Sequence, residues 1–220
     1  MILFQFLQAK SVGLGSLILA GGWLMIPLFI LSAISIFIFF ERWSIIRKAS
    51  VKDNRFLGRI RDLIYAGNID QALLICRKKN SPISRMVERG ILSMGRPAAE
   101  VHTAIENVAN LEVARLEKGL PFLATTSGGA PMIGFLGTVL GMVQAFMNLS
   151  QAGGTVDMAL LSSGIYTAMI TTVAGLVVGI PAYFGYNFLV TKIERLVFEM
   201  EANTVAFMDI INTEEGSYGN

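Results

Sequence analysis

Three long runs without a charged residue alternate with charged segments along this chain. They cover residues 11–40, 119–156 and 158–191 and are 30, 38 and 34 residues long. An apolar helix needs only about 20 residues to cross the hydrocarbon core of a bilayer, and a charge at its centre would cost about 2.5–3.5 kcal/mol. The pattern therefore predicts an all-α membrane protein with three transmembrane helices, at 17–40, 119–148 and 158–191.

Between the first two spans, residues 41–118 have apolar positions at helical spacing and predict a cytoplasmic helical bundle. Pro82 either ends or starts one of its helices, and a bend is expected at Gly119, just before the second span. Beyond the third span, residues 192–220 continue as an amphipathic cytoplasmic helix, with a disordered polar tail expected from Asn212.

The distribution of basic residues predicts the orientation. Residues 41–118 hold 15 of the 18 Lys and Arg residues, whereas the short connection 149–157 holds none. Because cationic loops stay on the cytoplasmic side, the N-terminus is expected outside and the C-terminus inside. Residues 1–16 are expected to form an interfacial helix on the outer side, and Pro27 is expected to kink the first span. The bundle's mixed charge gives no case for nucleic acid.

The chain lacks the usual constellations of catalysis and metal binding. It has one cysteine, Cys76, and one histidine, His102, so neither an internal disulfide nor a Cys/His zinc site can form. The run GFLGTVLG lacks the Gly-Lys-Ser/Thr ending of a phosphate-binding loop. No enzyme activity, cofactor or metal is therefore expected, and both residues are interpreted as parts of the helical bundle.

Small residues and threonines recur at spacings of three and four in the second and third spans, which places them on one face of each helix. The candidates for close packing are Gly134, Gly137, Gly141, Gly175 and Gly179, and the candidates for a polar pathway are Thr138, Thr172, Thr167 and Thr171. Spacing alone favours plain helix packing, with threonines bonded one turn back. Since no Asp, Glu, Lys, Arg or His lies within any span, a partner subunit is expected to supply any titrating group.

The runs LEKGLPFLATTSGGAPMIGFLGTVLGMVQAF and GIYTAMITTVAGLVVGIPAYFGYN resemble the ExbB, TolQ and MotA family of proton-channel motor stators, and the layout is most similar to ExbB. The resemblance implies a homopentamer in the bacterial inner membrane, with the N-terminus in the periplasm. It implies a pore around an ExbD/TolR-type partner, whose single span bears an aspartate, and mechanical work on a TonB/TolA-type protein. Thr138 and Thr172 match the family's pore threonines, whereas Thr167 stands where many members carry a glutamate.

Three alternatives remain open at this point. The subunit could be of TolQ type and serve envelope integrity. A transporter or channel subunit with its own solute pore is disfavoured, because the chain shows neither inverted repeats nor an intramembrane ion ligand. A structural scaffold would use the glycine faces for packing alone. A neighbouring reading frame for a short protein with one aspartate-bearing span would favour the stator.

Overall fold

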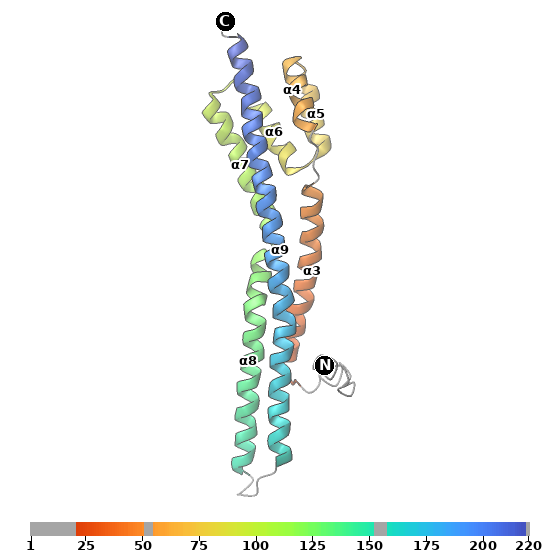
Figure 1. Ribbon diagram of the computed structural model, residues 1–220, viewed down its shortest axis with the longest axis vertical. Helices are drawn as coiled ribbons and strands as arrows, with labels where there is room; N and C mark the ends of the chain where they lie inside the picture. The colour runs from red at the N-terminus through yellow and green to blue at the C-terminus, as the bar shows by residue number, and fades with distance from the viewer. Residues whose placement is uncertain (1–20, 51–54, 152–157, 219–220) are drawn as a thin grey trace, which may run out of the picture. The chain divides into compact units, whose positions relative to one another are not determined.

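The computed structural model describes residues 21–50, 55–151 and 158–218 (Figure 1). Within these ranges all regular secondary structure is helical, which confirms the predicted all-α class. The interfacial helix expected at 1–16 and most of the connection expected at 149–157 lie outside the described residues. The helices are α3 (Met25–Ala49), α4 (Phe56–Tyr65), α5 (Ile69–Lys79), α6 (Pro82–Leu92), α7 (Ala98–Glu117), α8 (Leu120–Gln151) and α9 (Met158–Tyr218).

The chain divides into two compact units, and the long helices α3 and α9 contribute to both. The first unit combines residues up to Phe39 with Pro121–Tyr186, and the second combines Phe40–Leu120 with the chain from Asn187 onward. Among the described residues, three helical segments are long and apolar enough to cross a membrane, beginning at Met25, Ala98 and Leu161.

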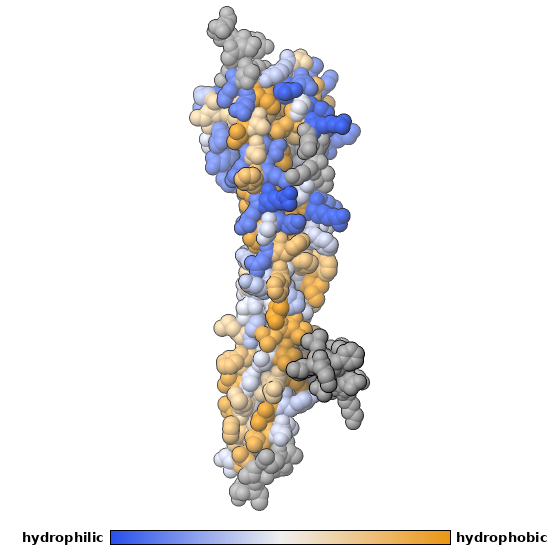
Figure 2. Space-filling model, viewed as in Figure 1, coloured by the Kyte–Doolittle hydropathy of each residue, from blue (hydrophilic) through white to orange (hydrophobic). Residues whose placement is uncertain are grey.

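The surface of the first unit is apolar, as Figure 2 shows over α8 and the first half of α9. Large side chains such as Phe37 and Phe184 are 69% and 67% exposed. Contiguous apolar surface of this kind is rare on soluble proteins and is expected where hydrocarbon is the solvent. The chain is therefore a multi-pass membrane protein, and the first unit holds its spanning segments.

Pro27 lies at the start of a helix rather than inside one, as the sequence had suggested. Helix α3 begins at Met25, so Pro27 lies in its first turn, where backbone N–H groups lack intrahelical partners and proline is tolerated. The kink expected at Pro27 is therefore not needed. Pro131 and Pro181 instead lie inside α8 and α9.

The second unit is the helical bundle expected from the sequence pattern. Phe56, Ile60 and Ile64 form the buried face of α4. Pro82 starts α6, because Ser81 caps that helix by accepting a hydrogen bond from the Ser84 N–H. Of the two possibilities that the sequence left open for Pro82, the structure thus has the start of a helix.

The start of α8 and the end of α9 depend on different features of the sequence. Gly119 adopts a φ of +86° between α7 and α8, a conformation that glycine accepts without steric cost and that breaks the helix at the expected bend. At the other end, α9 runs past Asn212, where the tail was expected, to Tyr218. Glu214 and Glu215 are good helix formers. The expectation of a disordered tail rested on the polarity of these residues and did not include their helix propensity.

Candidate functional site

Helices α8 and α9 approach one another at their small residues. A Cβ atom added to Gly175 would lie 2.5 Å from the Ala130 carbonyl oxygen and 3.0 Å from the Gly134 Cα atom. One added to Gly134 would lie 2.8 Å from the Thr171 carbonyl oxygen. Because these neighbours are backbone atoms and cannot rotate away, glycine is required at both positions for the observed separation.

The same close approach extends along both helices. A Cβ atom on Gly141 would lie 2.8 Å from the Ala168 Cβ, and one on Gly164 would lie 2.6 Å from the Ala145 Cβ. Gly179 faces the ring of Pro131, since a Cβ atom added to Gly179 would lie 2.6 Å from the Pro131 Cδ. From Gly164 to Gly179 the contact covers about 22 Å of α9, at 1.5 Å per residue.

A threonine pair joins the two helices at the middle of this contact. The Thr138 and Thr172 hydroxyls are hydrogen-bonded to each other. Thr172 Oγ1 also lies 3.1 Å from the Gly134 carbonyl oxygen across the interface, and Thr138 Oγ1 lies 3.3 Å from the same oxygen, one turn back on its own helix. The two threonines thus bond a backbone carbonyl, as plain helix packing predicts, and their hydroxyls also meet between the helices.

Thr171 occupies the interface itself and is 2% exposed. Its hydroxyl donates to the Ala168 carbonyl oxygen at 2.7 Å, with the Gly134 carbonyl oxygen at 3.4 Å. Gly137 faces this side chain, so the absence of a Cβ there makes room for Thr171. Thr171 therefore acts as packing between the helices, with its hydroxyl satisfied by backbone.

Helix α3 covers one edge of the α8–α9 pair, and the threonine pair lies on the other. Met25 and Leu28 of α3 pack with Ala130, and Ile133, Ala174 and Val178 surround them. At about 100° per residue, Ala174 and Thr172 lie about 160° apart around α9, and Ile133 and Thr138 lie about 140° apart around α8. The hydroxyl pair is therefore on the edge that α3 leaves open, and both threonines are partly exposed there.

Thr167 is not brought to this pair. It precedes Thr172 by five residues, which is about 140° around the helix, and it shares the face of Ala174, seven residues on. Its side chain is half-buried. The structure thus separates the four threonines named from the sequence into a bonded pair, an interface residue and a residue on the opposite edge.

The chemistry available at the pair is hydrogen bonding without titration. A hydroxyl donates one hydrogen bond and accepts two, so the pair can bind water or a carboxylate, but its own protons stay in place at ordinary pH. Among the described residues no group of three His, Cys, Asp or Glu side chains could hold a metal ion. Outside the spans, burial raises the pKa of the Cys76 thiol to about 12, with Glu88 adding to the effect and Lys79 opposing it.

A cluster in the second unit was missed by the sequence reasoning. Glu112 of α7 is 3% exposed, and its carboxylate accepts from Arg85 Nε at 2.9 Å and from Arg115 Nη1 at 2.7 Å. Arg85 also donates to the Asn80 carbonyl oxygen at 3.0 Å. Helix α3 joins the cluster, because Arg42 is buried and donates to the Arg115 carbonyl oxygen at 3.1 Å. Of these contacts, helical spacing in the sequence predicts only the pair of Glu112 and Arg115, which are three residues apart.

These features define a multi-pass α-helical membrane protein in which two glycine-lined spans hold hydroxyls between them. A model of the MotA/TolQ/ExbB proton channel family matches residues 78–202, which include most of both spans. The chain belongs to this family, whose members are proton-channel and transport-associated subunits rather than a known class of enzyme.

Individual relatives extend the similarity beyond the family match. A putative biopolymer transport protein ExbB homolog of Methanothermobacter thermautotrophicus is 30% identical over 177 residues, covering 79% of this chain and 62% of the relative. A putative ExbB-like protein of Synechocystis is 33% identical over 181 residues, covering 79% and 69%. The Tol-Pal system protein TolQ of Haemophilus influenzae is 39% identical over 93 residues, covering 42% and 40%. The chain thus aligns to less than two thirds of the length of the Methanothermobacter relative.

Proposed function

We propose that this chain is an ExbB-like subunit of a motor driven by the proton-motive force in the bacterial inner membrane. Copies of it, as a homopentamer, surround a single-span partner of ExbD type, whose membrane aspartate takes up and releases protons. The subunit lies with its N-terminus in the periplasm and its C-terminus in the cytoplasm. Proton flow produces mechanical work that a TonB-like protein uses for transport across the outer membrane.

The observation that carries the proposal is the bonded pair of Thr138 and Thr172. The two hydroxyls bond each other and the Gly134 carbonyl oxygen, but each hydroxyl oxygen can accept a further hydrogen bond on the open edge, and a lipid surface would offer no donor for it. They suit a surface that meets water or a partner's carboxylate, because a hydroxyl stabilises the ionised form by hydrogen bonding and so lowers the carboxyl pKa. The predicted spans contain no Asp, Glu, Lys, Arg or His, so in this proposal the proton carrier belongs to the partner.

A TolQ-type subunit working with TolR-type and TolA-type partners is the second candidate. The identity to the Haemophilus TolQ supports it, but ExbB-like relatives align to far more of the chain. Deletion of the gene separates the two: loss of energy-dependent uptake supports the ExbB role, and loss of envelope integrity with normal uptake supports the TolQ role.

The direct test uses the complex of this chain with its single-span partner in liposomes. We expect an imposed proton gradient to drive flux that is lost when the partner's membrane aspartate is changed to asparagine. Thr172→Val removes the hydroxyl at nearly constant volume, and we expect flux to fall about tenfold, which corresponds to about 1.4 kcal/mol and to one hydrogen bond to a charged group. Thr172→Ser should restore most of the flux.

Thr191→Val is the matched control, because Thr191 lies on the same helix and bonds only one turn back, to the Asn187 carbonyl oxygen at 3.0 Å. Its flux should equal that of the wild type. Normal flux in Thr172→Val, with assembly intact, would contradict the role of the threonine pair. Flux of a solute through this chain alone would instead support the transporter, and complexes without any flux would support the scaffold.

A further inference from the structure

The open edge of α8 and α9 carries a second set of hydroxyls besides the threonine pair. Ser127 precedes Thr138 by eleven residues on α8, and Tyr183 follows Thr172 by eleven residues on α9. Eleven residues make three helical turns and about 20°, so each residue lies on nearly the same face as its threonine. Because the two helices are antiparallel and in contact, equal steps of about 16 Å bring Ser127 and Tyr183 to the same level. We refer to this place as the Ser127–Tyr183 site.

The site combines several hydrogen-bonding groups where α8 and α9 still pack closely. A Cβ atom added to Gly179 would lie 3.0 Å from the Ser127 carbonyl oxygen. This oxygen lacks its usual helical donor, because Pro131, four residues on, has no N–H. The Ser127 hydroxyl donates to the Ala124 carbonyl oxygen at 2.7 Å and can still accept. Tyr183, which is 55% exposed, adds a phenolic hydroxyl. Such a set of donor and acceptors suits a bound water molecule.

The site divides a long stretch without charge. The first charged residue of α9 beyond Thr172 is Lys192, twenty residues or about 30 Å further on. Tyr183 lies eleven residues along this stretch, and Ser127 stands at the same level on α8. A charge is costly in hydrocarbon, so a proton that crosses this distance needs polar groups on the way. Tyrosine also occurs at the membrane–water boundary, but that role does not require the face that Tyr183 shares with Thr172.

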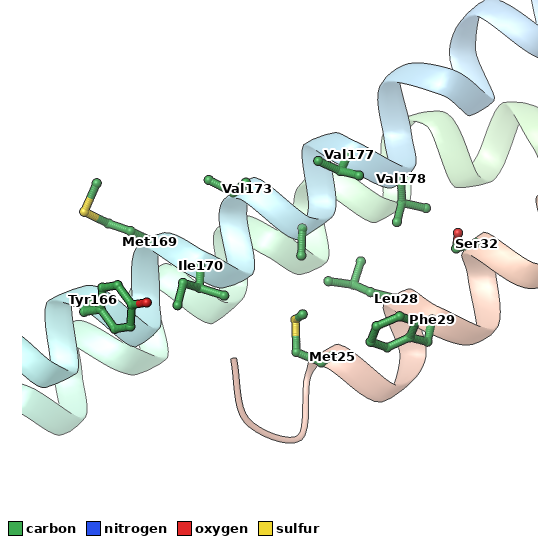
Figure 3. A pocket seen from close by; sticks show the side chains of 11 residues that line it. Met25, Leu28, Phe29, Ser32, Tyr166, Met169, Ile170, Val173, Val177 and Val178 are labelled. Carbon is green, nitrogen blue, oxygen red and sulfur yellow. The ribbon is translucent and has the colours of Figure 1, made fainter. Parts of the chain in front are cut away.

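The edge of the helices that α3 covers is different. A space of about 460 Å³ lies there between α3 and α9, and its lining is apolar apart from the side-chain oxygen atoms of Ser32 and Tyr166 (Figure 3). These two residues lie at opposite ends of the space in Figure 3, with Leu28 and Val178 among the residues between them. This lining therefore offers no polar pair at one level, and Tyr166 is a tyrosine of α9 that faces away from the threonine pair.

We propose that the Ser127–Tyr183 site binds the water through which the proton leaves on the cytoplasmic side of the pore. The partner's carboxyl group gives its proton to water and becomes a carboxylate, and the site stabilises the water that carries the proton onward. Each hydroxyl of the site keeps its own proton. This inference rests on the proposed function, because it needs a proton released beside the threonine pair.

The first test measures proton flux through the complex of this chain and its partner in liposomes. Tyr183→Phe keeps the ring and removes the hydroxyl, and we expect flux to fall about fivefold. That change corresponds to about 1 kcal/mol, as expected for one neutral hydrogen bond. Ser127→Ala should act in the same direction. Tyr166→Phe is the matched control, because it removes the same atom from a 49% exposed tyrosine on the other edge of α9, and its flux should equal that of the wild type.

The outcomes separate this inference from the proposed function. Normal flux in both Tyr183→Phe and Ser127→Ala, with Thr172→Val still impaired, would overturn the role of the site and leave the motor subunit standing. Flux that does not need the partner's aspartate would contradict the proposed function itself. An equal loss in Tyr166→Phe and Tyr183→Phe would show a general effect of removing tyrosine hydroxyls and would also overturn the inference.

The second test asks whether the site meets water. The complex with Tyr183→Cys is treated from the C-terminal side with a negatively charged methanethiosulfonate, which does not cross membranes. Cys76, the only cysteine of the native sequence, is buried. We expect Tyr183→Cys to react at least tenfold faster than Phe184→Cys and then to lose flux, because Phe184 is 67% exposed but points about 100° away around α9. Equal rates at the two positions, fast or slow, would show a residue of the membrane boundary rather than of the pore and would refute the proposal.

Discussion

The substitution Gly175→Ala tests whether the α8–α9 contact depends on the absence of a side chain. The added Cβ would lie 2.5 Å from the Ala130 carbonyl oxygen, whereas ordinary contact begins at 3.4 Å, so the helices must separate by about 0.9 Å. A gap of 0.5–1 Å forfeits about a quarter to a half of the dispersion energy of the atoms that face it. Overpacking costs about 1–3 kcal/mol, and a rigid backbone neighbour favours the upper half of that range.

The separation would also disturb the site. Thr172 Oγ1 lies 3.1 Å from the Gly134 carbonyl oxygen, and a further 0.9 Å would take this pair beyond hydrogen-bonding distance. We therefore expect Gly175→Ala to lose about 2 kcal/mol and to lower the unfolding midpoint by about 4–8 °C, the shift typical of a chain of this size. Thermal unfolding in nanodiscs measures the midpoint, and the liposome assay should show reduced proton flux in the same variant.

Gly128→Ala provides the control for that experiment. Gly128 lies on α8 in the same unit, and a Cβ there would meet nothing within 4 Å. Alanine is favoured over glycine in a helix by about 1 kcal/mol, so this variant should be unchanged or slightly more stable. If Gly175→Ala and Gly128→Ala had the same midpoint, the inference that the glycines permit the close approach would be refuted.

Two further predictions concern the second unit. Glu112→Gln removes the charge between two arginines, and we expect it to lower the free energy of unfolding by about 2 kcal/mol; an unchanged denaturation midpoint would show that the cluster is not stabilising. The Cys76 thiol, with its pKa raised to about 12, should react with iodoacetamide at pH 8.5 only after unfolding. Because the folded-state pKa exceeds the ordinary thiol pKa of 9.0, the contribution of this thiol to stability should be present below pH 9 and lost as the pH approaches 12. Rapid alkylation of the native protein would contradict the burial of this thiol.

The sequence predicts what depends on local pattern. Charge-free runs indicate the spans, because the cost of a charge in hydrocarbon applies to any fold. The spacing of the small residues places them on one face of each helix, and Gly134 and Gly175 do face each other in the structure. Spacing could also have separated Thr167 from Thr172, since five residues turn a helix by about 140°.

Other features depend on residues that are distant in the chain. Glu112 meets Arg85 from 27 positions away, and Arg42 meets the carbonyl of Arg115 from 73 positions away. No helical period relates these pairs. A sequence reading therefore assigns such charges to solvent by default, and only the packing of α3, α6 and α7 shows that they are buried. The edge covered by α3 is likewise a property of tertiary packing.

The glycines and threonines of the spans act together rather than as alternatives. Without a side chain, Gly134 exposes its carbonyl oxygen to the facing helix, where Thr172 bonds it and Thr171 approaches it. Close packing thus orients the hydroxyl of Thr172 and holds it beside Thr138. In the proposed motor this rigidity has a use, because a partner that moves past the pair would meet hydroxyls at fixed positions and spend no energy ordering them. A substitution that loosens the glycine contact should therefore reduce coupling even where both hydroxyls remain, and that is the combination of stability loss and flux loss expected for Gly175→Ala.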